Sequence, residues 1–99
     1  METTRLDQYL TTLREHLPEL AKKFKVLSLS VFGSYAHDEE HAGSDLDLLV
    51  TFRETPSLLT FLALENYLTD LLGIQVDLVM KDALKPRIGA RVLSELVPV

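Results

Sequence analysis

Hydrophobic segments of two different periods alternate along the chain, and this alternation limits its fold more than any other feature. Apolar residues three and four positions apart between 6 and 24, and again within 58–72, are typical of amphipathic helices. Runs rich in apolar and β-branched residues at 26–32, 46–52 and 75–80 predict strands. A 99-residue chain with this alternation is expected to form one α/β or α+β domain, spanning 1–99, with helices packed on a small mixed β-sheet.

Serine, glycine and proline mark the expected ends of these segments. Ser57 is a natural N-cap, and Gly73 a natural stop, for the helix at 58–72. Pro18 is expected to kink the first helix or to start a second one. Pro86 suits the first turn of a last helix that runs to about residue 96, and Pro98 is expected to end regular structure. The apolar stripe of the helix at 58–72 is predicted to consist of Leu58, Leu62, Leu68, Leu71 and Leu72.

The acidic excess of the chain lies in one short segment. The chain carries 15 Asp plus Glu and 10 Lys plus Arg, which gives a net charge of −5. Residues 38–47 hold a matching surplus of acids without any Lys or Arg. Of these, Asp38, Glu39 and Glu40 are interpreted as a solvated loop. This acidic balance argues against direct binding to nucleic acid, which requires a basic face.

Several classes of protein are excluded by what the chain lacks. It has no Cys, which rules out disulfides, thiolate metal sites and a thiol nucleophile. Its longest uninterrupted apolar run, residues 61–64, is far too short for a membrane span. The first residues have no apolar segment of the signal-peptide type. We therefore expect a cytoplasmic protein that does not contact a membrane.

Three carboxylates are placed on predicted strands. Asp45 and Asp47 stand two residues apart at the start of the strand at 46–52, so both should point to one face. Asp77 lies inside the strand at 75–80. If the two strands pair, the three acids converge, and their repulsion would raise their pKa values unless a cation is bound. Oxygen ligands favour Mg²⁺ or Mn²⁺. The alternative is three solvated carboxylates at strand ends or at a sheet edge.

Gly33 and Ser34 follow the first strand at the point where the chain turns. Glycine lets the backbone come close to a ligand, and the Ser34 hydroxyl with N–H groups at a following helix start can hold a phosphate. No Gly-Lys-Ser/Thr sequence follows, so this is not a P-loop. Gly-Ser alone is usually only a turn. Combined with a carboxylate pair and a third carboxylate, it indicates metal-assisted phosphoryl or nucleotidyl transfer.

Two stretches of the chain carry a family resemblance. They read Gly33-Ser34-Tyr35-Ala36 and Ser44-Asp45-Leu46-Asp47-Leu48-Leu49-Val50. With Asp77 as a third acid, they resemble the signature of the nucleotidyltransferase superfamily related to DNA polymerase β. The chain is similar to the minimal nucleotidyltransferases, which are the stand-alone core of that superfamily. The resemblance implies the polymerase β-like nucleotidyltransferase fold.

The resemblance also implies roles for individual residues. Asp45 and Asp47 would bind Mg²⁺ together with ATP, and Asp77 would complete a second metal site and help to deprotonate the acceptor hydroxyl. The nucleotide-binding residues would be Gly33, Ser34 and Ser44. Minimal members pair with a helical HEPN-domain toxin, so the chain is expected to be an antitoxin that transfers AMP to a tyrosine hydroxyl of that partner. Two alternatives remain: an inactive antitoxin that acts by binding alone, and nucleotidyl transfer to a small molecule.

The chain departs from the family pattern at one place. His37-Asp38 stands where relatives often carry Arg-Gly, which favours the binding-only alternative, whereas the three intact acids favour catalysis. His37 and His41 are interpreted as solvated loop residues and not as a metal pair. A basic group near the C-terminus is interpreted as the solvated side of the last helix, with contact to phosphate or to an acidic partner face as the alternative. This basic group consists of Lys81, Lys85, Arg87 and Arg91.

Overall fold

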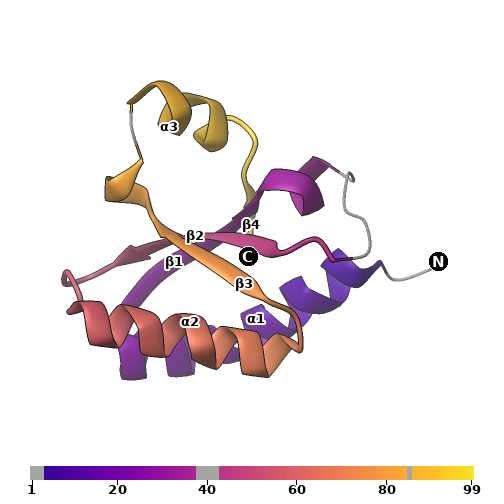
Figure 1. Ribbon diagram of the computed structural model, residues 1–99. Helices are drawn as coiled ribbons and strands as arrows, with labels where there is room; N and C mark the ends of the chain where they lie inside the picture. The colour runs from indigo at the N-terminus through magenta and orange to yellow at the C-terminus, as the bar shows by residue number, and fades with distance from the viewer. Residues whose placement is uncertain (1–3, 38–42, 85) are drawn as a thin grey trace.

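The computed structural model describes residues 4–37, 43–84 and 86–99. Its elements follow one another in the order α1 (Arg5–Phe24), β1 (Val26–Phe32), η1 (Gly33–His37), β2 (Leu46–Phe52), α2 (Leu58–Leu72), β3 (Val76–Met80), η2 (Lys81–Ala83), α3 (Pro86–Leu93) and β4 (Val97–Pro98). Here η denotes a short 3₁₀ helix. Figure 1 shows a twisted sheet with α1 and α2 on one side and α3 on the other. The predicted acidic loop residues Asp38, Glu39 and Glu40, with His41, lie outside the described residues.

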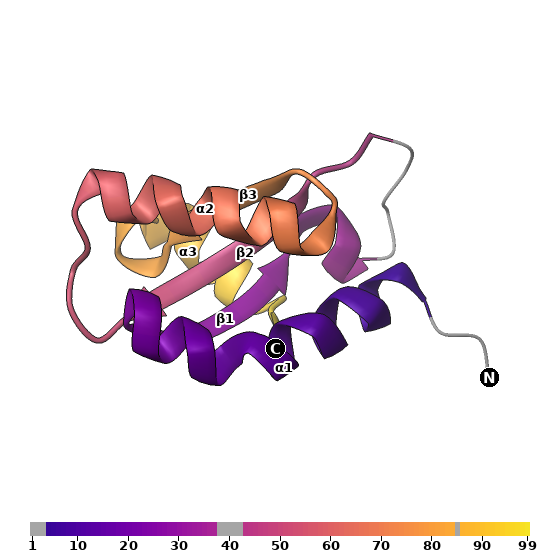
Figure 2. The same cartoon turned by 90° about the horizontal axis from the view of Figure 1, so that it is seen from below.

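The sheet has four strands in the order β3-β2-β1-β4. β1 runs antiparallel to both β2 and β4, while β2 and β3 are parallel and are connected through α2. Figure 2 shows α1 and α2 side by side across one face of this sheet. The expected small mixed sheet packed with helices is therefore confirmed.

Strand alternation decides which side chains form the core. In β2, Leu46, Leu48 and Val50 are fully buried toward α1 and α2, and in β3 Val76 and Leu78 occupy the same side. The helices contribute leucines to the same cluster. These are Leu10, Leu13 and Leu20 of α1 and Leu64 and Leu68 of α2. Residues of odd number in β2 and β3 are left to the opposite face, where α3 gives only partial cover.

Most of the expected element ends are confirmed, and three are wrong. Ser57 caps α2 by accepting a hydrogen bond from Thr60 N at 3.2 Å, and Gly73 ends it in the left-handed conformation. Pro18 does not start a second helix, because it lies at an exposed position inside a single α1, where the backbone carbonyl it leaves unbonded can reach water. The last helix ends at Leu93 rather than near residue 96. Pro98 does not end regular structure, because it lies in the edge strand β4, where its missing N–H costs no ladder bond.

The predicted apolar stripe of α2 is partly wrong. Leu68 is fully buried and Leu71 and Leu72 are half-buried, but Leu58 is 72% exposed and Leu62 is 42% exposed. Leu62 follows the half-buried Phe61, and one residue turns the side chain about 100° around a helix, away from the sheet.

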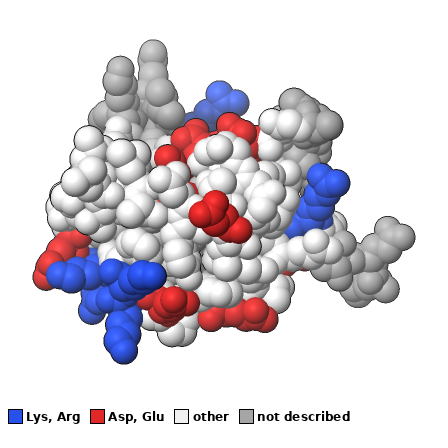
Figure 3. Space-filling view, turned by 60° about the horizontal axis from the view of Figure 1, so that its bottom comes forward, with Lys and Arg blue, Asp and Glu red and all other residues white. Residues whose placement is uncertain are grey.

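Figure 3 turns the molecule so that its helix-covered underside comes forward, and basic side chains gather at one corner of the view. In the part of the chain that the structure describes, no helix is both long enough and apolar enough to cross a membrane.

Candidate functional site

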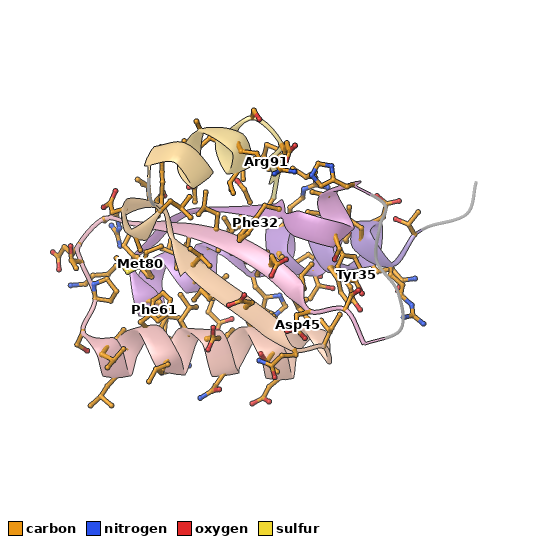
Figure 4. All side chains as sticks on the ribbon, turned by 45° about the horizontal axis from the view of Figure 1, so that its top comes forward. Phe32, Tyr35, Asp45, Phe61, Met80 and Arg91 are labelled. Carbon is orange, nitrogen blue, oxygen red and sulfur yellow. The ribbon has the colours of Figure 1, made fainter. Side chains whose placement is uncertain are left out.

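Two of the three predicted acids meet on the sheet face that α1 and α2 do not cover. In the parallel register of β2 and β3, Asp47 lies directly beside Asp77. Their flanking residues Leu48 and Leu78 are buried toward the helices, so the alternation of a strand turns both carboxylates to the other side. Figure 4 looks onto this face from above. The expected convergence of these two acids is therefore seen in the fold.

Asp47 is the electrostatic centre of this group. The pKa of Asp47 is raised from 3.8 to about 6, first by burial and then by the charges of Asp77 and Asp45. A side-chain hydrogen bond between Asp47 and Asp77 acts in the same direction. Asp77 and Asp45 are exposed, and Asp45 lies one residue before β2. A carboxylate whose pKa is raised by burial and by two nearby acids is typical of a functional site, and a nearby cation would lower this pKa again.

Gly33 is fitted against Asp47. The antiparallel register pairs Asp47 with Phe32, so the chain turns into η1 immediately beside this carboxylate. A Cβ at Gly33 would overlap Oδ2 of Asp47, and the φ of Gly33 is +73°, a conformation that favours glycine. The predicted glycine thus allows close approach of the backbone, and the group it approaches is the carboxylate of Asp47.

A hollow of about 290 Å³ opens beside Gly33. Its lining residues are Phe32, Gly33, Ser34, His37, Arg91, Val92 and Glu95. Nε2 of His37 lies 2.9 Å from Oε2 of Glu95, and this pair joins η1 to the segment that follows α3. Ser34 is half-buried in the same hollow. Of the predicted phosphate-binding residues, Gly33 therefore borders Asp47 on one side and a small hollow on the other, and Ser34 lines the same hollow.

Ser44 lies elsewhere. Together with Asp45 it lines a different hollow, whose other walls include Tyr9, Tyr35 and Gly73. The rings of Tyr9 and Tyr35 meet edge to face at 5.8 Å between centroids, which fixes α1 against η1. The structure thus places the predicted nucleotide-binding residues in two separate hollows, with Ser44 apart from Gly33 and Ser34.

The donor set fits a hard divalent cation. Among the described residues, no three His, Cys, Asp or Glu side chains are grouped closely enough to enclose an ion by themselves. Mg²⁺, however, is commonly held by one or two carboxylates and takes its other oxygens from substrate phosphates and water. Asp47 and Asp77, with the raised pKa of Asp47 beside Asp45, offer such a pair. The magnesium site remains a prediction, and the side chains present are compatible with it.

Sequence analysis missed residues of α2 that hold β3 in place. Oε2 of Glu65 accepts a hydrogen bond from the backbone N–H of Leu78 at 2.9 Å. Oγ1 of Thr69 accepts one from the N–H of Val76 at 3.1 Å. These two bonds satisfy donors on the outer edge of β3, one on each side of Asp77 in the chain. The available signal for Glu65 was an acid next to the buried Leu64 in a mostly apolar helix, whose other acid, Asp70, is exposed.

The chain is similar to known proteins in both sequence and structure. Residues 13–99 match the family described as nucleotidyltransferase domain. A Thermococcus cleftensis protein named protein adenylyltransferase MntA is 49% identical over 92 residues, which cover 93% of each chain. A solved structure described as a proposed minimal nucleotidyltransferase has a TM-score of 0.78 and 39% identity, and the match covers 93% of this chain and 94% of that one.

A more distant likeness concerns the fold alone. A chain from the complex of an MNT antitoxin with a tri-AMPylated HEPN toxin of Shewanella oneidensis has a TM-score of 0.60 at 21% identity. The match covers 95% of this chain and 67% of that chain.

Proposed function

Because this chain belongs to the nucleotidyltransferase domain family and is an enzyme of that class, we propose that it transfers AMP from ATP to a hydroxyl group of a protein partner. The partner we propose is a helical HEPN toxin, the acceptor is a tyrosine, and the chain acts as the antitoxin in the cytoplasm. The name of the T. cleftensis relative supports protein adenylylation. The S. oneidensis complex, whose HEPN toxin is tri-AMPylated, supports the choice of partner.

One observation carries the proposal. Asp47 and Asp77 stand side by side in the parallel strands, and Asp45 is near enough to raise the pKa of Asp47. Like charges brought close together give a fold no stability, and here they contribute to the strongly raised pKa of Asp47. Such a cluster is expected where a cation and a nucleotide bind.

In the proposed reaction, Asp77, Gly33 and Ser34 each have a separate role. The acceptor oxygen attacks the α-phosphorus of ATP, and its proton passes to Asp77, the exposed carboxylate of the adjacent pair. The bond from the α-phosphorus to the bridging oxygen breaks, and pyrophosphate leaves with that oxygen. Gly33 lets the backbone lie close to Asp47, and the Ser34 hydroxyl donates to a phosphate oxygen in the adjoining hollow.

Asp45, Asp47 and Asp77 are the residues that would hold magnesium. When bound, Mg²⁺ supplies charge that neutralises the triphosphate and makes the attacking hydroxyl more acidic. Its arrival would also favour the ionised form of Asp47, whose pKa is about 6 without it.

The proposal is tested by labelling. The purified chain is incubated with Mg²⁺, α-labelled ATP and the helical protein encoded beside it. We expect label on a tyrosine of that partner, lost when the tyrosine is replaced by Phe. Asp47→Asn and Asp77→Asn should lower the rate by roughly a thousand-fold, which corresponds to about 4 kcal/mol of transition-state stabilisation. Asp70→Asn, an exposed acid on α2, is the matched control and should label at the wild-type rate.

The other outcomes separate the alternatives. If the partner is neutralised without label, and equally well by Asp47→Asn, the chain acts by binding alone. The contact between His37 and Glu95 is the observation that favours this alternative, because it engages the His37 side chain, which lines the hollow beside Gly33 where a phosphate would bind. Label on a small hydroxyl compound, and none on the partner, would show nucleotidyl transfer to a small molecule.

A further inference from the structure

The hollow beside the three acids contains a basic side chain that no step above uses. Arg91 lies in the last turn of α3 and is exposed, and it shares the hollow with Ser34 and His37. Figure 4 shows Arg91 next to Phe32, where β1 ends. Within 4–37, 43–84 and 86–99, its guanidinium makes no ion pair with a carboxylate. Arg91 is therefore a cation at this hollow that no described carboxylate pairs with.

The other two ionisable side chains of the hollow, His37 and Glu95, contact each other. Nε2 of His37 lies 2.9 Å from Oε2 of Glu95, so the carboxylate of Glu95 is engaged with His37 and not with Arg91. The pair also ties η1 to the end of the α3 segment, which holds the wall carrying Ser34 against the wall carrying Arg91. Among the described lining residues, Arg91 is thus the cationic side chain that is not engaged with another charged group.

Gly33 lies between the hollow and the carboxylate of Asp47 and borders both. A ligand that reaches Asp47 with one phosphate therefore has its remaining phosphates beside the hollow. The volume of the hollow, about 290 Å³, is at the lower end of the range of ligand pockets, roughly 300–1,000 Å³. This size suits a phosphate chain better than a whole nucleotide.

We propose that Arg91 binds the β- and γ-phosphates of the nucleoside triphosphate, with the Ser34 hydroxyl as a second donor. A guanidinium matches phosphate well, because its planar array of N–H donors can form two parallel hydrogen bonds. The idea rests on the proposed nucleotidyl transfer, and it changes the interpretation of Arg91 from a solvated helix residue to a substrate-binding one. It also explains how the site can bind phosphates although position 37 carries a histidine held by Glu95.

The test compares ATP with AMP. Binding of each nucleotide with Mg²⁺ is measured by calorimetry for the wild type, Arg91→Gln, Arg91→Lys and Arg14→Gln. Arg91→Gln should weaken ATP binding by roughly 10- to 100-fold, the effect of a lost charged hydrogen bond, and change AMP binding less than twofold. Arg91→Lys should fall between the two. Arg14, an exposed arginine of α1, is the matched control and should change neither.

The possible results are distinct. Equal ATP binding by Arg91→Gln and the wild type, or an equal loss for ATP and AMP, overturns the role of Arg91. Failure of the wild type to bind ATP overturns it as well. If the wild type binds ATP through Arg91 but never labels an acceptor, the proposed transfer fails and the phosphate site stands. If it labels its partner and Arg91→Gln leaves the KM for ATP unchanged, the transfer stands and the Arg91 proposal fails.

Discussion

On the side of the sheet that α1 and α2 cover, Leu48 of β2 is fully buried in the leucine-rich core. On the other side its neighbour Asp47 is half-buried and carries a carboxylate with a pKa of about 6. The same difference recurs in β3, where Leu78 is buried toward the helices and Asp77 is exposed beside Asp47. One pair of strands thus carries the core on one face and the acid cluster on the other.

The difference between the two faces shows how a short chain can be stabilised by a buried core on one face while it carries destabilising acids on the other. Burial of the leucines supplies favourable free energy through apolar area removed from water. The acids work against folding, because they repel one another and Asp47 is partly removed from water. Alternation keeps the two sets at fixed register, since a slip by one residue would exchange their faces. The two faces should therefore respond in opposite ways to substitution.

The largest expected effect on stability is at the covered face. Leu48→Ala should lower the free energy of unfolding by about 2–5 kcal/mol, because Leu48 is fully buried and its loss leaves a cavity. Asp47→Asn, one residue away, should leave stability unchanged or raise it, because it removes a charge from the cluster. Urea denaturation at pH 7 without divalent cations measures both. A loss in Asp47→Asn as large as that in Leu48→Ala would contradict the distinction between the faces.

The hydrophobic pattern was enough to predict most of the fold. The bounds of β1 and β2, the caps of α2 and the mixed sheet follow from local periodicity and turn chemistry, and they are confirmed. The motif around Gly33 and Asp45 was specific enough to predict the family, which the match over residues 13–99 confirms. The hydrophobic pattern does not predict features that depend on tertiary contacts. Pro98 pairs with β1, and Leu58 of α2 is exposed. Both facts depend on tertiary packing, which the local hydrophobic periodicity does not contain.

The sequence was enough to predict that Asp47 and Asp77 come together, but not which other residues line the neighbouring hollow. Asp47 and Asp77 were linked by the assumption that their strands pair, and the parallel register brings them together. Arg91 and Glu95 lie more than fifty residues after Ser34, and only the path of α3 over the end of β1 brings them to the same hollow. Ser44 follows the motif in sequence, yet it lines a different hollow. Spacing along a chain does not determine such contacts.

A smaller effect on stability is expected from alanine at Gly33, the turn residue that contacts Asp47. Gly33 and Gly73 have almost the same φ, +73° and +69°, but a Cβ meets Asp47 at the first and nothing within 4 Å at the second. Gly73→Ala should lower the free energy of unfolding by about 1–2 kcal/mol, because alanine is strained in the left-handed conformation. It should leave nucleotidyl transfer unchanged. Gly33→Ala should show this backbone cost and also displace the Asp47 side chain, so that transfer falls at least tenfold.

Urea denaturation and initial rates, measured on both glycine variants, separate the backbone cost from the contact. Equal rates in Gly33→Ala and Gly73→Ala would show that the close fit at Asp47 has no role in the reaction.

The smallest effect is the pH dependence of the acid face itself. The pKa of Asp47 is raised from 3.8 to about 6 on folding, so between these values the folded chain binds more protons than the unfolded chain. Stability contributed by this group is therefore present at low pH and is lost as pH rises from about 4 to 6. After allowance for the solvent around a half-exposed group, the loss should be about 1 kcal/mol. Urea midpoints of the metal-free wild type and Asp47→Asn between pH 4 and 7 measure it as the difference between the two curves.

Magnesium provides the control for this pH effect, because a cation binds the ionised acids and should return the lost stability at pH 7. It should do so in the wild type and in Asp70→Asn, and not in Asp47→Asn. An equal gain in all three would mean that the cation acts elsewhere on this acidic chain. In that case the raised pKa of Asp47 would reflect only its burial next to Asp77, and the acid face would be a cost of the fold without a cation to offset it.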